Sequence, residues 1–369
     1  MKKIIYIANI RLPTEKAHGI QVMKSCEAFA DAGINVELWI PGRKTPIKEN
    51  PFDFYSVRRN FVIKKLNSFD ASNFRFQTFF FLLKLIFTKV PKDSLVYTRS
   101  VEIAWFMSKR GYKTTYESHL WPENKQVLHI YLLNTVSFIV CNSKGTEAEY
   151  LKRGFKNTLS VPNGVDLGMF RAEENTKELR RGLDLPEDRT IIMYTGHLYS
   201  WKGVDVVVEA AKEIKDDSRY FFVFVGGTDK DLIRYRKIKE NENLYNAVFV
   251  GYKEQKEIPK YLACADVLLL PNVPISEESE RYTSPIKVFE YMASGKPIVA
   301  SNMSSILEIL NEKNSILVNP SDVTDLIRGI NKASGDQAHT KEITHEALKN
   351  VQNYTWTKRA EKILQFLNK

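Results

Sequence analysis

Short apolar runs alternate with longer amphipathic stretches along this chain, a pattern typical of α/β proteins built on parallel strands. In the first half, strands are predicted at residues 3–8, 36–40, 94–99, 114–119, 137–141 and 159–162. In the second half, strands are predicted at residues 190–196, 221–225, 247–250, 266–270 and 298–300. Amphipathic helices are predicted at residues 20–30 and 204–214. The simplest topology is two doubly wound domains in series, with the charged stretch 171–188 crossing between them.

The stretch from Ser284 to Ala300 carries helix signals at both ends. Ser284 is a good N-cap, and Pro285 suits the first helical position because its missing N–H costs nothing there. Gly295 can take the left-handed conformation that ends a helix, and an apolar run typical of a buried parallel strand follows. The stretch therefore predicts a short helix that leads directly into a strand.

One face of this predicted helix has the residues of a ligand site. Ile286, Lys287 and Glu290 are three and four residues apart, so they share one side of the helix. The N–H groups of Ile286 and Lys287 and the helix dipole form an anion site, and the Glu290 carboxylate could accept two hydrogen bonds from a ribose diol. This face indicates a nucleotide diphosphate; the alternative is an amphipathic helix whose Glu290 is simply solvated.

Composition places the chain among ordinary globular proteins. Of 369 residues, 43% are apolar and 27% are charged. Cys26, Cys141 and Cys264 are far apart and form no short motif, which favours buried thiols in a reducing compartment, that is, the cytoplasm. The apolar N-terminus is too short for a signal peptide, and we interpret it as the first strand.

The basic charge is concentrated in the first half of the chain. Residues 1–165 contain 25 Lys and Arg residues against 13 Asp and Glu, whereas the rest contains 29 against 31. This asymmetry favours an anionic partner for the first half: an acidic membrane surface or a phosphorylated acceptor. Nucleic acid ranks last because no zinc, basic heptad or aromatic RNA-binding pattern accompanies the charge. A basic surface that only aids solubility is the alternative.

The segment from Phe74 to Lys89 is helical in length, very aromatic and edged by cations. It is too short and too charged to span a bilayer. Two interpretations stay open for it. The segment lies in a membrane interface with its cations toward anionic lipid, or it packs on the sheet as part of the core.

Polar residues follow two predicted strands of the first half, at the edge of a parallel sheet where ligands bind. Arg99 ends one strand, and Glu117 and His119 end the next. Gly19 lies in the loop after the first strand, where a glycine lets the backbone approach a ligand closely, although a plain turn explains it equally well. Arg99, Glu117 and His119 are therefore candidate acceptor-side residues.

Residues 196–203, Gly-His-Leu-Tyr-Ser-Trp-Lys-Gly, form a second candidate phosphate segment. Lys202 and Gly203 follow a predicted strand and open a helix, where a diphosphate binds readily. Asp229 and Asp231 have the spacing of a metal-binding pair, but they begin a helix, where acids favour the dipole. We interpret them as a helix start and expect neither a metal site nor a cofactor.

Together these motifs resemble the retaining, sugar-nucleotide-dependent glycosyltransferases of the GT-B fold, specifically glycosyltransferase family 4. The resemblance covers most of the chain and keeps the order of the motifs, which are Gly19, His119, 161–166 (Val-Pro-Asn-Gly-Val-Asp), Gly196 with Lys202 and Gly203, Val225-Gly226-Gly227, Val250-Gly251 and 285–293 (Pro-Ile-Lys-Val-Phe-Glu-Tyr-Met-Ala). Residues 353–356 and the final helix resemble the helix of this family that returns to the first domain.

This resemblance implies two Rossmann-like domains facing a cleft. The first, residues 1–168 with the helix 352–369, would bind a saccharide, lipid-linked or small-molecule acceptor. The second, residues 169–351, would bind the nucleotide sugar through residues matching the family's donor site: Gly196, His197, Lys202, Gly226, Gly251, Ser284, Ile286, Lys287 and Glu290, with Gly19 from the first domain.

Two positions depart from the family pattern. Glu290 matches the second glutamate of the family's Glu-x7-Glu motif, but the first glutamate is replaced by Tyr282, with Glu280 two residues earlier. Tyr282 or Glu280 substitutes for it, or the donor sugar is held otherwise. His197 stands where the family often has an arginine, and it is a weaker, pH-dependent cation. The identity of the sugar is therefore left open.

The resemblance implies catalysis by preorganised charge without a metal. His119, Lys202 and Glu290 are the predicted catalytic residues. The candidates to stabilise the departing diphosphate are the side chains of Lys202 and His197 and the backbone N–H groups of Gly19, Ile286 and Lys287. The predicted function is a retaining glycosyltransferase of cell-surface polysaccharide or glycolipid synthesis, in the cytoplasm and peripheral to the inner membrane face. The alternatives are a nucleotide-sugar epimerase of the same fold and an inactive nucleotide-sugar-binding protein.

Overall fold

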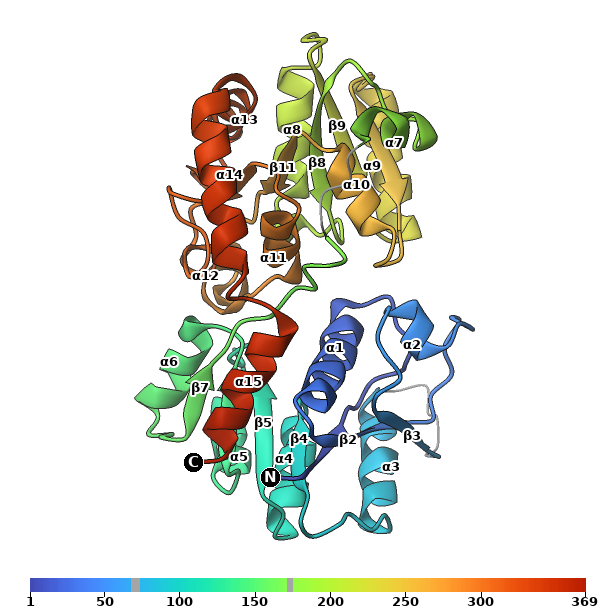
Figure 1. Ribbon diagram of the computed structural model, residues 1–369, viewed down its shortest axis with the longest axis vertical. Coiled ribbons are helices and arrows are strands. Elements are labelled where there is room, and N and C mark those ends of the chain that lie inside the picture. The colour runs from blue at the N-terminus through green and yellow to red at the C-terminus, as the bar shows by residue number, and fades with distance from the viewer. Residues whose placement is uncertain (68–73, 171–174) are drawn as a thin grey trace. The chain divides into compact units, whose positions relative to one another are not determined.

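The computed structural model describes residues 1–67, 74–170 and 175–369 (Figure 1). Residues 171–174, where the predicted crossing between domains begins, lie outside the described residues. The chain divides into two compact units, residues 1–164 with 356–369 and residues 165–355. Each unit has its own parallel sheet, and each is described separately below.

The first domain contains a seven-stranded sheet with the order β3-β2-β1-β4-β5-β6-β7. All of its described pairings are parallel. Its strands are β1 (Lys3–Ile7), β2 (Asn35–Pro41), β3 (Val62–Leu66), β4 (Leu95–Thr98), β5 (Thr114–Ser118), β6 (Phe138–Cys141) and β7 (Thr158–Ser160). Its helices are α1 (Ala17–Asp31), α2 (Pro51–Phe54), α3 (Phe74–Ile86), α4 (Val101–Lys109), α5 (Gln126–Leu133), α6 (Lys144–Lys152) and the C-terminal α15 (Trp356–Leu367).

The second domain contains a six-stranded parallel sheet with the order β10-β9-β8-β11-β12-β13. Its strands are β8 (Thr190–Thr195), β9 (Tyr220–Val225), β10 (Ala247–Gly251), β11 (Val267–Leu270), β12 (Ile298–Ser301) and β13 (Ile316–Val318). Its helical elements are α7 (Thr176–Gly182), η1 (Ser200–Lys202), α8 (Val204–Glu213), α9 (Asp229–Asn241), α10 (Ile258–Cys264), η2 (Glu278–Tyr282), α11 (Ile286–Ala293), α12 (Ser304–Leu307), α13 (Val323–Gly335) and α14 (Gln337–Val351).

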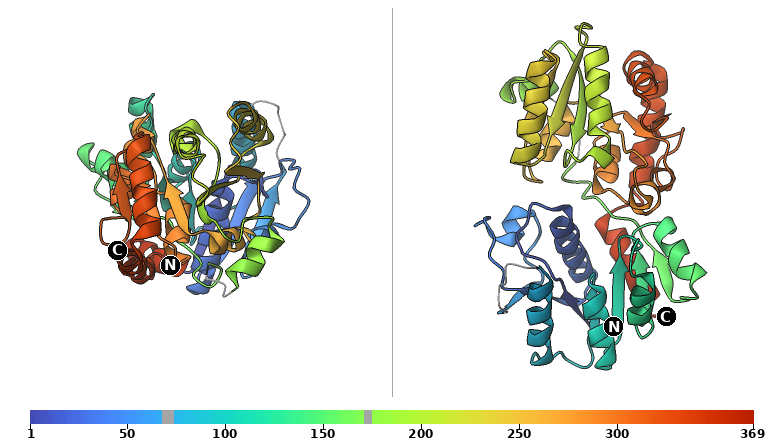
Figure 2. Two further views of the ribbon diagram at one scale, coloured as in Figure 1. Left: turned by 90° about the horizontal axis from the view of Figure 1, so that it is seen from above. Right: turned by 180° about the vertical axis from the view of Figure 1, so that it is seen from behind.

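The apolar runs are nearly continuous because both faces of the sheet are buried. In β8, Ile191 and Met193 belong to one buried cluster, whereas Ile192 and Tyr194 belong to a second one. Successive side chains of a strand point to opposite faces, so both faces of this sheet are covered by helices (Figure 2). The fold class predicted from the sequence, two doubly wound Rossmann-like domains, is confirmed.

The C-terminal helix α15 packs on α1 of the first domain, as Figure 1 shows. The chain leaves the second domain at Thr355, which forms an isolated parallel bridge with Val165, and the N–H of Val165 donates to the carbonyl of Tyr354 at 2.9 Å. The units therefore divide at 164/165 and 355/356, a few residues from the predicted 168/169 and 351/352, because these two segments pair before they separate.

Two local predictions are corrected. Helix α11 begins at Ile286, and its N-cap is Pro285 in an extended conformation, so Ser284 precedes the cap instead of forming it. The φ of Pro285 is compatible with a helix, but its ψ of 128° is extended, so Ile286 is the first helical residue. Gly295 follows the helix with a φ of +68°, as predicted. Strands β3 and β13 were absent from the predicted set.

The aromatic segment predicted at Phe74 to Lys89 forms helix α3 and the residues just after it. Its residues Phe81 and Leu85 are fully buried in the core of the first domain, whereas Phe76, Phe79 and Phe87 have more than half of their surface exposed. The core interpretation therefore holds for one face of the helix only. Within the described ranges, no helix has both the length and the apolar character needed to cross a bilayer.

Candidate active site

Glycine backbones meet at the carboxyl ends of three neighbouring strands of the second domain. The N–H of Gly196, after β8, donates to Val225 O at 2.8 Å, and the N–H of Gly226, after β9, donates to Gly251 O at 2.8 Å. Gly226 has a φ of +121°, and a Cβ atom there would lie 2.2 Å from the carbonyl oxygen of Gly196. Only glycine fits, so this edge of the sheet consists of backbone without side chains.

Lys202 and Gly203 follow at the start of α8. Gly203 has a φ of +73°, and a Cβ atom there would lie 1.7 Å from the carbonyl oxygen of Pro271, so the loop closes tightly against the end of β11. Lys202 ends the short η1 turn, with Nζ 5.0 Å from the centroid of the Trp201 ring. The ring of His197 stacks on Tyr199 at 5.0 Å. Both predicted cations thus belong to one loop after β8.

Lys287 lies in the first turn of α11 and is 7% exposed. Its Nζ sits 3.9 Å from the centroid of the Tyr194 ring and has no hydrogen-bond partner in the described part of the chain. Burial lowers the pKa of this ammonium well below its usual value, and the nearby Lys202 lowers it further, against the opposite influence of Glu290. A buried cation without hydrogen bonds is costly, and an anion bound at the N-terminus of α11 would relieve that cost.

Glu290 lies one turn further along α11 and is 6% exposed. Burial raises the pKa of its carboxyl group to about 7, while a hydrogen bond from Gln255 and the charge of Lys287 act in the opposite direction. Gln255 Nε2 donates to Glu290 Oε1 at 2.5 Å. Gln255 follows β10 and was missed in the sequence, because nothing in a single chain pairs it with a residue 35 positions away.

The position of the missing first glutamate is filled by a core residue. Tyr282 ends η2, is 2% exposed, and its hydroxyl donates to Glu277 Oε2 at 3.4 Å. Glu280, from the same turn, is half-buried. Ser284 and Ile286 are also half-buried, at the entrance to α11. Glu277 was not singled out in the sequence, since only the contact with Tyr282 marks it.

In the first domain, the two strand-end residues form a tight pair. His119 Nε2 lies 2.9 Å from Glu117 Oε1. Burial and the Arg99 cation lower the pKa of His119 to about 4 although Glu117 opposes them, so the ring is neutral at neutral pH. A neutral ring that donates from Nε2 keeps Nδ1 as an acceptor.

Glu117 is held in place by elements that are distant in sequence. Arg359 from α15 donates to its Oε1 at 2.7 Å and Gln21 from α1 donates to the same oxygen at 2.6 Å. Burial raises the pKa of this carboxyl group, but Arg359 and His119 outweigh it, so the pKa lies well below its usual range. Arg99 joins the network by donating to Gln21 Oε1 at 3.0 Å. Arg99, Glu117 and His119 are therefore brought together, as the sequence indicated.

Gly19 has a different environment from the predicted one. It lies inside the first turn of α1, not in the loop before it, and its N–H donates to Lys16 O at 2.9 Å. A Cβ atom on Gly19 would lie 2.2 Å from the hydroxyl of Tyr55, which itself bonds the backbone of Thr14. Packing against Tyr55 explains this glycine, and its N–H is already used within the helix.

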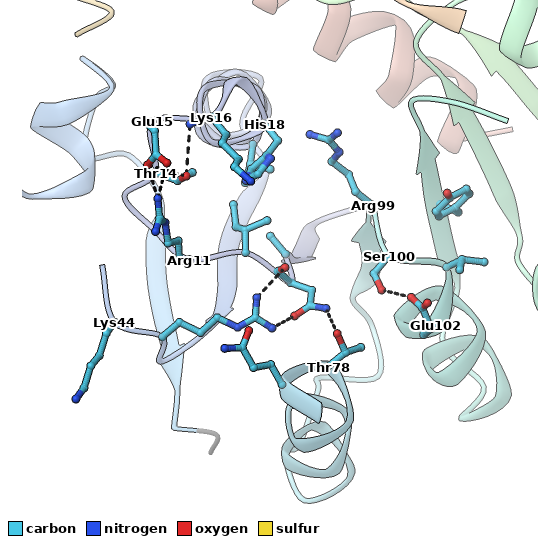
Figure 3. Close-up of a pocket in the computed structure, with 18 residues that line it drawn as sticks. Arg11, Thr14, Glu15, Lys16, His18, Lys44, Thr78, Arg99, Ser100 and Glu102 are labelled. Carbon is cyan, nitrogen blue, oxygen red and sulfur yellow. Dashed lines mark hydrogen bonds and ion pairs between the residues drawn. The ribbon is translucent and has the colours of Figure 1, made fainter. Parts of the chain in front are cut away.

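A cavity of about 900 Å³ lies at the carboxyl edge of the first domain's sheet (Figure 3). Arg99 lines it, together with the loop after β1 and the first turn of α1. In the portion of the chain that the structure describes, no group of three His, Cys, Asp or Glu side chains could hold a metal ion. Asp231 completes a capping box with Thr228 at the start of α9, which agrees with its interpretation as a helix start.

The two parallel-sheet domains, with glycine loops at the strand ends of the second, have the fold of the GT-B class. Residues 175–350 match the family model described as "Glycosyl transferases group 1". The second domain is therefore similar to the group 1 glycosyltransferases, and the resemblance seen in the motifs, including family 4, agrees with this match.

Curated relatives and solved structures agree with this class. The chain is 25% identical over 219 residues to TuaC of Bacillus subtilis, a glycosyltransferase assigned to teichuronic acid biosynthesis, covering 59% of this chain and 51% of TuaC. It is 28% identical over 211 residues to the sulfoquinovosyl transferase SQD2 of Arabidopsis thaliana, covering 54% of this chain and 38% of SQD2. The chain thus spans about half or less of these relatives' length. Anabaena Alr3699/HepE in complex with UDP-glucose superposes with a TM-score of 0.80 at 16% identity over both whole chains.

Proposed function

We propose that the chain is a retaining glycosyltransferase that transfers a sugar from a nucleotide diphosphate sugar to an acceptor, without a metal ion. The group 1 family match of the second domain and the assignment of TuaC to a polysaccharide pathway support this proposal. The acceptor class that fits best is a saccharide or lipid-linked saccharide of cell-surface polysaccharide synthesis. The location that fits is the cytoplasm, at the inner face of the membrane.

The observation that carries the proposal is the pair formed by Lys287 and Glu290 on α11. The first is a buried ammonium without a hydrogen-bond partner among the described residues, at a helix N-terminus. The second is a buried carboxyl group one turn later, held by Gln255. A diphosphate would accept hydrogen bonds from the Lys287 ammonium, and the ribose hydroxyls would donate to the Glu290 carboxylate. The backbone glycines after β8 and β9 leave room beside them.

The chemistry of the transfer follows from charge. The bond between the sugar C1 and the diphosphate oxygen breaks, and its electron pair stays on that oxygen. Lys202, Lys287 and the first N–H groups of α11 stabilise the negative charge that develops there. The acceptor hydroxyl bonds to C1 from the same face, and its proton passes to the departing diphosphate oxygen.

His119 acts on the sugar in this proposal. Its Nε2–H is engaged by Glu117, so Nδ1 is the atom that accepts a hydrogen bond from a sugar hydroxyl. Neutrality at working pH keeps His119 from repelling the positive character that develops at C1. The first glutamate of the family motif is absent, and Glu280 or Glu277 beside Tyr282 is the carboxylate that takes over its contact with the donor sugar.

A thermal-shift screen against nucleoside diphosphates and their sugars tests donor binding, because a ligand of the folded state raises its stability. The nucleoside diphosphate with one particular nucleobase is expected to stabilise the protein more than the others. Glu290→Ala is expected to weaken that nucleotide by about tenfold or more, since charge-assisted hydrogen bonds are worth about 1.5–3 kcal/mol. A Glu290→Ala protein that binds nucleotide as well as the parent would contradict the site.

The identified donor then separates the candidate activities. Labelled donor alone is expected to remain largely unchanged, and adding an acceptor is expected to give a product whose anomeric configuration matches the donor. Conversion of the donor sugar without an acceptor indicates the epimerase alternative. Nucleotide binding with neither reaction, across a panel of acceptors, indicates the inactive alternative.

A further inference from the structure

The cavity at the carboxyl edge of the first domain's sheet is lined by six segments: the residues after β1, the N-terminal half of α1, the segment after β2, part of α3, the residues after β4, and Tyr116 of β5. Its volume of about 900 Å³ is that of a pocket for a ligand of one or two sugar units. All of its lining residues belong to the first domain, which the resemblance to glycosyltransferase family 4 assigns to the acceptor.

Cations dominate the lining of this cavity. The wall carries five Lys and Arg residues against two glutamates: Arg11, Lys16, Arg43, Lys44 and Arg99 against Glu15 and Glu102. A concave surface with one excess sign of charge concentrates ligands of the opposite sign. The basic excess found in the first half of the sequence thus has a specific place in the fold.

Part of this charge is already compensated or used for structure. Arg11 forms an ion pair with Glu15, and Arg43 donates to Asn9 Oδ1 at 2.6 Å. Lys16 and Arg99 differ, since neither forms an ion pair with a carboxylate in the ranges the structure describes. Among the described residues, neither side chain is therefore held in a direct ion pair, although Arg99 also donates to Gln21 Oε1 at the edge of the Glu117 network.

Lys16 and Arg99 converge on the first turn of α1. Figure 3 shows Arg99 extending toward His18, whereas Lys44 extends away from this group. Burial together with the cations of Arg99 and Lys16 lowers the pKa of His18 to about 4. Helix α1 has no acidic residue in its first turn, so its positive dipole end adds to the two cations. An anion bound here meets two cations and a helix N-terminus at once.

We propose that this cavity binds an oxyanion of the acceptor, a carboxylate or a phosphate group, through Lys16 and Arg99. This inference rests on the proposed function and on the family resemblance that assigns the acceptor to the first domain. A guanidinium can engage either oxyanion with two hydrogen bonds, and the ammonium of Lys16 acts as a point charge. The enzyme would thus select acidic acceptors, uronic acids or phosphorylated sugars, over neutral ones.

Equilibrium binding of three probes to the full chain tests the proposal: glucose, glucuronate and glucose 6-phosphate. At least one anionic probe is expected to bind about tenfold or more tightly than glucose, since hydrogen bonds to charged groups are the strong ones. Lys16→Gln and Arg99→Gln are each expected to remove most of that preference. Lys156→Gln, an exposed cation of the same domain outside the cavity, is the matched control and is expected to leave it unchanged.

The arms of the experiment separate the outcomes. A preference for glucuronate identifies a carboxylate acceptor, and a preference for glucose 6-phosphate identifies a phosphate. Equal binding of all three probes overturns the proposal. The proposal is also overturned if Lys156→Gln loses the preference for the anionic probe as much as Lys16→Gln and Arg99→Gln do. Displacement of the anionic probe by nucleoside diphosphate also overturns it, because the cavity then takes the donor. Binding is measured without turnover, so a failed transfer assay would leave this result standing.

Discussion

Lys287 combines burial, a lowered pKa and an ammonium nitrogen without a hydrogen-bond partner within the described ranges. A core position under selection for stability alone would not keep a lysine in this state, because an apolar side chain of similar length fits the same space. The cation contact with Tyr194 offsets only a part of the desolvation cost. The residue therefore has the physical features of a ligand site that is less stable without its ligand.

Replacing Lys287 by methionine is expected to change stability and binding in opposite directions. The ligand-free protein gains about 1–3 kcal/mol in its free energy of unfolding because a buried polar group is removed. Nucleotide diphosphate affinity falls at the same time, because the cation is lost. Urea unfolding and nucleotide titration measure the two effects. Lys260→Met, at an exposed site of the same domain, serves as the control, and a destabilised Lys287→Met with intact nucleotide affinity would assign Lys287 to structure alone.

At the scale of elements, one buried arginine of α15 joins several parts of the first domain. Arg359 is 3% exposed and bridges three parts of that domain: Glu117 on β5 at 2.7 Å, Ser25 on α1 at 3.4 Å and the carbonyl of Pro162 at 3.1 Å. Since Glu117 also holds His119, the C-terminal helix supports the residue proposed to contact the sugar. Removing one partner of a buried ion pair leaves the other charge uncompensated.

The Arg359→Met variant is expected to lose about 3–5 kcal/mol of unfolding free energy, because the Glu117 carboxylate then stays buried without its cation. The double variant Arg359→Met with Glu117→Gln is expected to recover part of this loss. Urea unfolding measures both, with Lys358→Met on the exposed side of the same helix as control. Equal stability of the single and double variants would show that the two charges are not coupled.

The same contacts show what a single sequence can and cannot reveal. Ile286, Lys287 and Glu290 could be placed on one side of a helix because their spacing follows from helical geometry alone. Likewise, apolar runs identified all of the described strands except β3 and β13. Arg359 and Gln255 could not be identified, since their partners lie 242 and 35 positions away in the sequence and only the tertiary fold brings them together. The environment of Gly19 was missed for the same reason, because it depends on Tyr55.

At the scale of the whole molecule, acid is expected to destabilise the protein. The pKa values of His18, His119 and His129 are each lowered to about 4, so the unfolded chain binds more protons between about pH 6.5 and 4. Their contribution to stability is complete above pH 6.5 and is lost as the pH falls toward 4. Glu290, with a pKa raised to about 7, acts in the opposite direction over pH 7 to 4.5. Because three histidines destabilise the protein on acidification and only Glu290 opposes them, the free energy of unfolding is expected to fall.

Two variants separate these contributions by sign. His129→Gln is expected to make the decrease of unfolding free energy between pH 6.5 and 4.5 shallower, by about one proton in the linkage slope. Glu290→Gln is expected to make it steeper, because the opposing group is removed. Denaturant unfolding at several pH values measures the slope in each. A steeper slope in His129→Gln, or a shallower one in Glu290→Gln, would contradict the assigned pKa directions.

The remaining basic and aromatic surface of the first domain is proposed to bind an anionic membrane. Phe76, Phe79 and Phe87 share one exposed face of α3 and its C-terminal end, with Lys84 and Lys89 exposed nearby. Apolar insertion combined with cations is the usual basis of peripheral binding to acidic lipid. The full chain is therefore expected to float with liposomes that contain anionic lipid at low salt, and to dissociate as salt screens the cations.

Serine at Phe76, Phe79 and Phe87 together is expected to abolish flotation while the circular dichroism spectrum and nucleotide affinity stay unchanged, because these side chains lie outside the core. Ile233→Ser, at an exposed apolar position of the second domain, controls for a general loss of surface hydrophobicity and is expected to float like the parent. Equal binding to neutral and anionic liposomes would show that the lysines near α3 do not contribute to membrane binding. Failure of the parent to float at low salt would remove the membrane from the proposed function and leave the acidic acceptor as the remaining proposed partner of the basic first domain.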